Sequence, residues 1–336
     1  MSKPPYTITE KAADYLAKIV ETVTRLEFGT GFKRDIKLHR ENRVRTIHSS
    51  LAIEGNTLSL GEVSAVIEGK VVAGKQTEVK EVKNAYEAYD KIMTFNPYAV
   101  KDFLKAHKLM TDGLVKEAGK FRSGDVGVFD GDVAIHIGAR PRFVQQLIED
   151  LFAWAKSSYL HPVLMSAILH YEIETIHPFA DGNGRMGRLW QTLLLAKWNA
   201  IFAWIPMESV VYQNRQEYYD ALYYGQHIAD SSKFIEFTLS ALLSSLEKIY
   251  ADSLNSANLD GDANQDTNQD ARVRIILAFC EEPRTRDEIQ RYIGITNRGY
   301  FRTKILKPLL ESGKLKMTIP DKPNSRNQKY VKALSS

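Results

Sequence analysis

The strongest constraint on the fold is a pair of apolar helical segments joined by a short glycine-rich loop. The apolar run over residues 163–176 must stop near His177, because Pro178 lacks the N–H that would continue a helix and disfavours helical backbone at the residue before it. Three glycines follow within residues 182–187, and apolar residues then recur at helical spacing up to residue 198. The sequence therefore predicts a helix, a glycine turn and a second helix, with His177 at or just past the first helix end.

This loop carries the residue types of a phosphate site. Backbone N–H groups at a glycine-rich helix start point toward one place and favour an anion there. Arg185 and Arg188 project from one side of the first turn, where each guanidinium can bind phosphate oxygens with two hydrogen bonds. Asp181 suits Mg²⁺ bound jointly with phosphates, and His177 can take a proton near neutral pH. A lone histidine or glycine turn is usually structural, but the combination indicates transfer of a nucleotide phosphate group.

The stretch 177–188 resembles the signature of the Fic (Fic/Doc) family, His-Pro-Phe-x-Asp-Gly-Asn-Gly-Arg-x-x-Arg, at every specified position. The resemblance extends over about residues 35–245 and implies a protein adenylyltransferase, which moves AMP from ATP to a hydroxyl side chain of a target protein and releases pyrophosphate. It implies that His177 is the base that deprotonates the hydroxyl, that Asp181 holds Mg²⁺ and that Phe179 anchors the loop to the core. By the same resemblance the phosphates are held by Gly182, Asn183, Gly184, Arg185 and Arg188.

A second short motif ends the helix predicted over about residues 37–54. Gly55 is placed as a helix-ending residue, and Glu54 lies where a helix C-terminus repels negative charge, which suggests a cationic partner over a merely solvated carboxylate. The segment resembles the inhibitory motif of Fic proteins, Ser/Thr-x-x-x-Glu-Gly/Asn, at Ser50, Glu54 and Gly55. The resemblance implies that Glu54 pairs with Arg188 and denies it to the γ-phosphate of ATP. Without that contact the α-phosphate does not lie in line for attack. Since a misplacement of about 1 Å can cost ~100-fold in rate, one carboxylate could inhibit the enzyme.

Residues 119–140 change character from helical to β-prone. Two short β-prone runs flank Asp130-Gly131-Asp132, which predicts a β-hairpin. Its analogue in the family is a flap that lays out the target segment by strand addition, and rough alignment places Val126 and Val128 near that contact. A surface hairpin without function is the alternative.

Helical periodicity predicts the remaining segments of the first 253 residues as helices, at about 8–26, 78–95, 98–117, 141–157, 214–228 and 231–253. Aromatic residues in the helix 214–228 are more often core than ligand-binding. In similar Fic proteins a tyrosine pair at this distance helps to line the adenine pocket, which implies Tyr218 and Tyr219 here. Gln226 stands where an asparagine often reaches the nucleotide, so the adenine contacts depart from the family pattern.

The composition changes after residue 253. Residues 254–270 are rich in Asn, Asp, Gln and Ser and predict a linker. Residues 271–336 hold 15 Lys and Arg against 6 Asp and Glu, a net charge of +9, whereas the first 270 residues hold 30 against 35, a net charge of −5. This tail predicts helices at 271–280, 285–293 and 297–312 and two strands around 320–327, a pattern that resembles a winged helix-turn-helix. DNA or protein contact is expected of its basic residues Arg298, Arg302, Lys304, Lys322, Arg326 and Lys329.

The sequence thus predicts a mostly α protein: a helical Fic domain with its inhibitory helix and β-hairpin flap over 1–253, a linker over 254–270 and a small winged-helix domain over 271–336. The first hypothesis is a self-inhibited adenylyltransferase that uses ATP and Mg²⁺ on a Ser, Thr or Tyr hydroxyl. The second is another phosphate or nucleotide transfer on the same fold, although Gly184 argues against a Doc-like kinase, whose motif has Lys there. The third is a nucleotide-sensing DNA-binding regulator, against which the intact His177 and Asp181 argue.

The composition limits which covalent links, metal sites and cellular locations are expected of this chain. The single cysteine, Cys280, permits neither an internal disulfide nor a cysteine metal site. No apolar run approaches the ~20 residues of a membrane helix and no signal peptide is recognisable, so no membrane partner and a cytoplasmic location are expected. Self-modification, pairing of two copies of the chain, and removal of AMP from targets with Glu54 orienting a water stay open, as do the target and whatever relieves Glu54.

Overall fold

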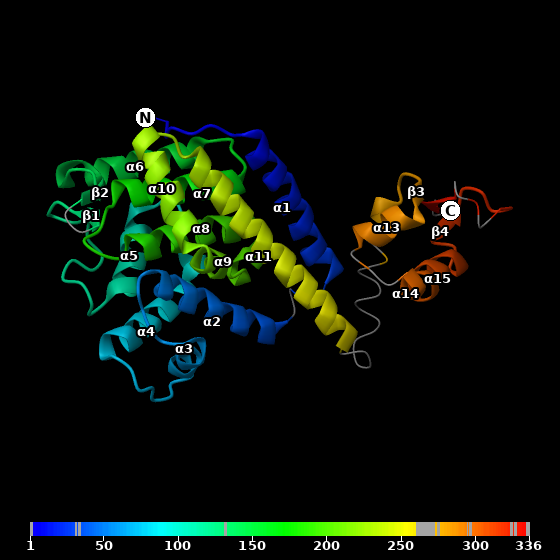
Figure 1. The fold of residues 1–336 in the computed structure, drawn as a ribbon, viewed down its shortest axis with the longest axis horizontal. Helices are drawn as coiled ribbons and strands as arrows, with labels where there is room; N and C mark the ends of the chain where they lie inside the picture. The colour runs from blue at the N-terminus through cyan, green and yellow to red at the C-terminus, as the bar shows by residue number, and fades with distance from the viewer. Residues whose placement is uncertain are drawn as a thin grey trace. The chain divides into compact units, whose positions relative to one another are not determined.

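A computed structural model describes the backbone of residues 3–30, 32, 35–130, 133–259, 273, 276–293, 295, 298–322, 325 and 328–333. The chain divides into two compact units (Figure 1), one formed by Met1–Val20 with Ile36–Glu247 and the other by Glu21–Asp35 with Lys248–Ser336. The predicted linker at 254–270 falls largely outside the described residues, so that domain division stays a prediction.

Two helices joined by the glycine-rich loop form the centre of the first unit (Figure 1): α7 (Pro162–Ile176) and α8 (Asn183–Trp198). Both are apolar on most sides and almost entirely buried, so each is covered by other helices rather than by solvent. The other helical elements of this unit are α2 (Ile36–Ile53), α3 (Leu60–Ile67), α4 (Gln76–Asp90), η2 (Ile92–Thr94), α5 (Val100–Thr111), α6 (Pro141–Ser157), η3 (Ala200–Trp204), α9 (Met207–Gln213) and α10 (Arg215–Ile228). Helices α1 (Glu10–Gly29) and α11 (Ser232–Leu259) belong to it as far as Val20 and Glu247.

The helix predicted over 98–117 is shorter than expected. It ends at Thr111, because Gly113 takes a left-handed backbone with φ of 69° that turns the chain away. The helix predicted over 78–95 is likewise divided into α4 and the single turn η2, since the chain is already leaving the helix at Lys91, ahead of the Asn96-Pro97 break. The predicted helical character of both segments is otherwise confirmed.

The predicted hairpin is present. Strands β1 (Gly127–Asp130) and β2 (Val133–Ile137) pair antiparallel, with Val128 opposite His136 and a bulge immediately after Val128. Val126 precedes β1 and accepts a hydrogen bond from the Gly138 N–H at 3.1 Å. The side chain of Val128 and the residues at the hairpin tip lie outside the described part of the chain, so the flap assignment of Val126 and Val128 stays a prediction.

The second unit holds a small helical core against a three-stranded antiparallel sheet. Its elements are α13 (Arg286–Tyr292), α14 (Arg298–Tyr300), the π-helical turn η4 (Phe301–Leu306), α15 (Lys307–Glu311), β3 (Arg284–Thr285), β4 (Leu315–Met317) and β5 (Lys329–Lys332). The strand order is β3-β5-β4. Apolar side chains from the helices, among them Ile289, Phe301 and Ile305, pack with Leu315 and Tyr330 of the sheet.

The two strands predicted around 320–327 are present. They lie at 315–317 and 329–332, on either side of that segment, and their buried residues Leu315 and Tyr330 pack on the helical core. The short strand β3 was not predicted, since two residues carry no periodicity. The capping box of Thr285 and Glu288 begins α13, as its sequence pattern indicates. Among the described residues, no helix is both long and apolar enough to cross a membrane.

Candidate active site

His177 lies directly after α7 in a left-handed backbone conformation, with φ of 53° and ψ of 62°. Its N–H still bonds to the Ile173 carbonyl at 2.9 Å, so the residue completes the helix while turning the chain out of it. Its Nδ1 lies 3.3 Å from the Glu174 carbonyl oxygen. Because a carbonyl can only accept, Nδ1 carries the hydrogen in the neutral ring, and Nε2 is the nitrogen able to take a proton.

A buried arginine that sequence reasoning missed holds this turn in place. The Arg122 side chain is only 3% exposed, and its Nε donates to the His177 carbonyl at 2.7 Å. Its two other nitrogens donate to the carbonyls of Gly124, Ala139 and Ile176, while its backbone N–H bonds to the Pro178 carbonyl. Burial lowers the pKa of Arg122. The guanidinium thus ties the base of the hairpin to the end of α7.

The loop after His177 is closed by Asn183. Its side-chain Oδ1 accepts from the Phe179 N–H at 2.8 Å, and its Nδ2 donates to the Phe179 carbonyl at 2.9 Å. Phe179 itself is fully buried, as expected of an anchor, and Gly182 takes a left-handed φ of 85° that few other residues tolerate. The amide of Asn183 is therefore engaged in shaping the loop, and its backbone N–H is the group that faces an anion.

His107 on α5, which the sequence predicts to be a core or helix-surface residue and not a catalytic one, is buried and supports the same loop. Its ring stacks on Phe179 with centroids 3.7 Å apart, its Nδ1 accepts from the Gly119 N–H at 3.0 Å, and its Nε2 lies 3.0 Å from the Asp181 carbonyl oxygen. Since Nδ1 accepts, Nε2 is the donor. Burial lowers the pKa of His107 to about 4, so the ring is neutral near pH 7. His107 is thus a positioning residue.

The start of α8 offers its backbone amides to the space in front of it. The first hydrogen bond of the helix runs from the Met186 N–H to the Gly182 carbonyl, so the N–H groups of Asn183, Gly184 and Arg185 precede the helical ladder. A Cβ added at Gly184 would collide with Oε1 of Glu54 and lie 3.0 Å from an Arg188 nitrogen. Glycine at this position therefore lets a carboxylate approach the helix start.

That carboxylate belongs to Glu54, which follows α2. The end of α2 is a Schellman motif, in which the Asn56 N–H bonds to the Leu51 carbonyl, the Gly55 N–H bonds to the Ala52 carbonyl, and Gly55 has a φ of 93°. The turn directs Glu54 back toward α8, where its Oε1 lies 2.7 Å from Arg188 Nη2.

Arg188 is fully buried, whereas the Glu54 side chain is 34% exposed. Arg188 Nε donates to Ser50 Oγ at 3.1 Å, and Nη2 donates to the Ser50 carbonyl at 3.0 Å. Burial alone would lower the pKa of Arg188, but the carboxylates of Glu54 and Glu174 outweigh it and raise that pKa above its ordinary value. Arg188 therefore carries a permanent charge whose closest compensation is Glu54.

The other signature residues lie on the outer side of the same turn. Asp181 Oδ1 accepts from the Gly182 N–H at 2.6 Å, and its Oδ2 lies 2.9 Å from Arg185 Nη2. The Asp181 side chain is 59% exposed, whereas that of Arg185 is only 4% exposed. Among the described residues, no group of three or more His, Cys, Asp or Glu side chains is arranged to hold a metal ion.

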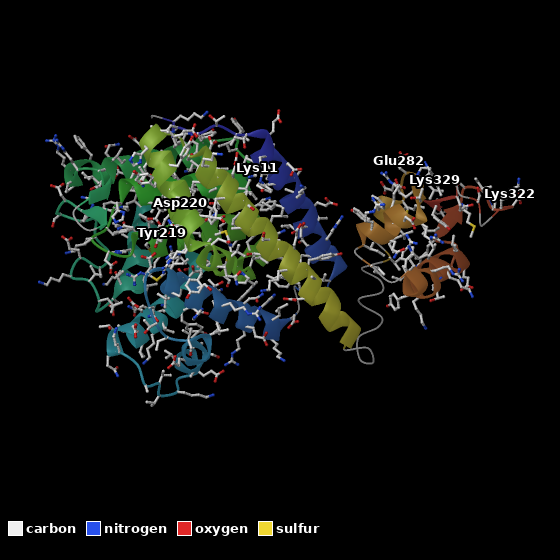
Figure 2. All side chains as sticks on the ribbon, in the orientation of Figure 1. Lys11, Tyr219, Asp220, Glu282, Lys322 and Lys329 are labelled. Atoms are coloured by element: carbon white, nitrogen blue, oxygen red, sulfur yellow. The ribbon has the colours of Figure 1, made fainter. Side chains whose placement is uncertain are left out.

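The residues predicted for the adenine pocket occupy three different environments on α10. Tyr218 is buried and donates to Glu174 Oε1 at 3.1 Å, within a cluster that includes His170. Tyr219, labelled in Figure 2, is 43% exposed and its hydroxyl reaches the Ile53 carbonyl at 3.4 Å, next to the turn that carries Glu54. Gln226 is half-buried two residues before the end of α10. The roles of all three in binding adenine stay predictions.

Comparison with known proteins shows the family to which this chain is similar. Residues 97–195 match the Fic/DOC family, and residues 271–331 match the C-terminal domain of the filamentation induced by cAMP protein Fic-like. The crystal structure of a Fic family protein from Desulfovibrio desulfuricans G20 is 37% identical with a TM-score of 0.71, and the match covers 100% of this chain and 99% of that chain. The chain belongs to the Fic/DOC family.

More distant members extend the comparison. The protein adenylyltransferase Fic of Nematostella vectensis is 32% identical over 216 residues, which are 61% of this chain and 47% of that protein. The structure of Fic-1 from C. elegans, 24% identical with a TM-score of 0.58, covers 73% of this chain and 74% of that chain and shares the fold. This Fic chain thus spans about half the length of the curated relatives it matches.

Proposed function

We propose that this Fic protein is a self-inhibited protein adenylyltransferase that transfers AMP from ATP to a Ser, Thr or Tyr hydroxyl of a target protein and releases pyrophosphate. The observation that carries the proposal is the position of His177, with Nδ1 turned toward a carbonyl, beside a helix start that offers three N–H groups and two arginines. The names of the curated relatives support AMP as the transferred group.

In this reaction Nε2 of His177 takes the proton of the target hydroxyl. The hydroxyl oxygen attacks the α-phosphorus, the bond from that phosphorus to the pyrophosphate oxygen breaks, and the electron pair leaves with pyrophosphate. The backbone of Gly182, Asn183 and Gly184 faces the α- and β-phosphates, with the N–H groups of Asn183 and Gly184 as donors, and Arg185 and Arg188 take the charge that develops toward the leaving group.

Asp181 is proposed to hold Mg²⁺. Its carboxylate is exposed at the mouth of the loop, and as a single protein carboxylate it fits a metal whose remaining ligands are waters and substrate phosphates. Bound there, Mg²⁺ would neutralise phosphate charge. Asp181 itself contributes by fixing the Gly182 N–H and by sharing the charge of Arg185.

Inhibition by Glu54 belongs to the same proposal. While Glu54 occupies Arg188 Nη2, that nitrogen is denied to a γ-phosphate, and the carboxylate also lies against Gly184, where phosphate would approach the helix start. Ser50 and Gly55 support this arrangement, the first by binding Arg188 and the second by allowing the turn. Tyr218, Tyr219 and Gln226 are proposed to line the adenine side.

The hairpin is proposed to present the target. Within the described residues β1 pairs only with β2, so a target segment can add to a remaining edge beside Val126 and Val128. Self-modification and pairing of two copies stay open, and a cytoplasmic location stays a prediction.

The test is incubation with α-labelled ATP and Mg²⁺, comparing the wild type with Glu54→Gly and with Glu54→Gly combined with His177→Ala. Label on the protein itself that is strong in Glu54→Gly and absent in the double variant is the expected result. If the protein were labelled only by γ-labelled ATP, the proposed activity would be that of a kinase and not of an adenylyltransferase. No label on the protein or on proteins of a host extract, despite ATP binding, would favour a nucleotide sensor.

We infer a second candidate function, DNA binding, for the C-terminal unit. The helical stretch 298–311 buries Phe301, Ile305 and Leu309 and leaves the opposite side exposed with Arg298, Arg302, Lys304 and Lys307. Residues 289–336 hold eleven Lys and Arg against two Asp and Glu, so the acids of this unit gather at its beginning. Lys322 and Lys329, labelled in Figure 2, are also exposed, whereas Arg326 lies outside the described residues. A winged helix-turn-helix presents such a helix to duplex DNA.

Full-length protein titrated with duplex DNA at several salt concentrations tests this function. Binding that weakens steeply with salt is expected, with a shallower slope in Arg302→Ala combined with Lys304→Ala. Lys11→Ala, which removes an exposed charge from the first unit, is the control and should leave the slope unchanged. Absence of salt-dependent binding would favour protein contacts for this unit.

A further inference from the structure

The turn that carries Glu54 is fastened to helix α4 by two glutamates. Glu78 Oε1 accepts from the Thr57 N–H at 3.1 Å and from Thr57 Oγ1 at 2.9 Å. One helical turn further on, Glu81 Oε2 accepts from Asn56 Nδ2 at 2.7 Å. Because Asn56 and Thr57 directly follow the Schellman turn, these contacts fix the direction in which Glu54 leaves α2.

Glu81 differs from Glu78 because it also reaches the signature helix. Its second oxygen, Oε1, lies 3.4 Å from Arg185 Nη1, while Arg185 Nη2 lies 2.9 Å from Asp181 Oδ2. Arg185 is 3% exposed, so water does little to compensate its charge, and its orientation depends on the carboxylates at its two ends. Asp181 belongs to the same loop as Arg185, whereas Glu81 comes from a separate helix.

We propose that Glu81 is a positioning residue that orients Arg185 toward the phosphates and ties it, through Asn56, to the turn that carries Glu54. The proposal rests on the nucleotide site of the proposed function. Without Glu81, the guanidinium is held by Asp181 alone and swings toward its own loop, away from the space in front of α8. Both signature arginines are then governed by one short stretch, since Glu54 holds Arg188 directly and Asn56 holds Arg185 through Glu81.

The experiment measures ATP affinity by titration calorimetry on full-length protein carrying Glu54→Gly, in which Arg188 is no longer occupied. Glu81→Gln keeps the size of the side chain and removes its charge, and Glu78→Gln makes the same change one helical turn earlier. Both loosen the turn after α2, but only Glu81 contacts Arg185. We expect Glu81→Gln to raise the Kd for ATP about 10-fold, the scale of one lost charge-assisted hydrogen bond, and Glu78→Gln to leave it unchanged.

A second matched pair tests the link through Asn56. Asn56→Ala removes the amide that steadies Glu81, and Thr57→Ala removes a side-chain hydrogen bond to Glu78 from the next position. In the same Glu54→Gly background, Asn56→Ala should raise the Kd for ATP about 3-fold, because Glu81 keeps its charge but loses one partner, and Thr57→Ala should not change it. Melting curves of all variants show whether each remains folded.

Several results would overturn the proposal. Equal weakening by Glu78→Gln and Glu81→Gln would assign the effect to the turn and not to Arg185. Unchanged or tighter ATP binding in Glu81→Gln would mean that Glu81 opposes the phosphates instead of positioning their arginine. If Asn56→Ala and Thr57→Ala gave the same Kd for ATP, the proposed link between Asn56 and Arg185 through Glu81 would be refuted. If the Glu54→Gly protein itself binds no ATP, the proposed function fails, and this proposal fails with it.

Discussion

Replacing Glu54 by Gln should lower the stability of the free protein and raise its affinity for ATP by the same free energy. The substitution keeps the shape of the side chain and removes its charge, 2.7 Å from a fully buried arginine. Any nucleotide that uses Arg188 must first displace Glu54, so the free energy of that contact is subtracted from the free energy of binding. Weakening the contact therefore stabilises the complex relative to the free protein.

The magnitude follows from burial. A hydrogen bond to a charged group contributes about 1.5–3 kcal/mol, and a neutral one about half of that. Gln can still accept from Arg188, and the one-third exposure of Glu54 discounts the charged contribution, which leaves a loss of about 1 kcal/mol. That is about 5-fold in the Kd for ATP and about 2–4 °C in the Tm of a unit of this size.

Calorimetric titration measures the Kd for ATP, and melting curves with and without ATP measure the stability of the free protein and of the complex. The free Glu54→Gln protein should melt below the wild type, and saturating ATP should raise its Tm more than it raises that of the wild type. Glu68→Gln is the control, because Glu68 pairs at the surface with Arg40 and Lys70. A lower Tm with an unchanged Kd for ATP would refute competition between Glu54 and the nucleotide.

Three further substitutions test other parts of the protein. Arg122→Lys should slow AMP transfer about 100-fold with little change in the Kd for ATP, because one ammonium cannot hold the carbonyls around His177 in place; an equal loss of ATP affinity would contradict this role. Gly55→Ala meets no atom within 4 Å but must keep a φ of 93°, so its Tm should fall by about 2–4 °C, the effect of about 1 kcal/mol of backbone strain. Burial raises the pKa of Glu172 to about 7 from 4.5, so the folded state holds this proton more tightly and stability falls as pH rises from 4.5 through 7. Glu172→Gln should therefore stabilise the protein by about 3 kcal/mol at pH 8 in urea unfolding and leave it unchanged at pH 4, whereas equal effects at both values would show that the carboxyl titrates normally.

The features that the sequence predicted well are those determined by neighbouring residues. Pro178 and Gly182 act on their own backbone, so the break between α7 and α8 follows from local rules. The same holds for Gly55, whose left-handed φ ends α2. The family resemblance supplied the predicted catalytic and binding roles, because the signature is contiguous and each role transfers to one numbered position.

The residues that support the site could not be predicted, because their partners are distant in the chain. Arg122 is 55 residues from His177, and His107 is 74 residues from Asp181. Glu81 is 104 residues from Arg185 and sits in an ordinary amphipathic helix, where a glutamate suggests a solvated side chain. Only the packing of α4 and α5 around α8 brings these groups together, and no periodicity encodes that packing.

Both signature arginines are almost completely buried in the free protein, and each already has a carboxylate partner: Glu54 for Arg188, and Glu81 with Asp181 for Arg185. A buried guanidinium without a partner is strongly destabilising. Arginines that bind a triphosphate in the complex therefore need other anionic partners when no nucleotide is bound. The contact proposed as inhibitory therefore also stabilises the fold. It follows that any change that relieves inhibition by moving the turn after α2 should also lower the stability of the free protein, and that ATP should restore the loss.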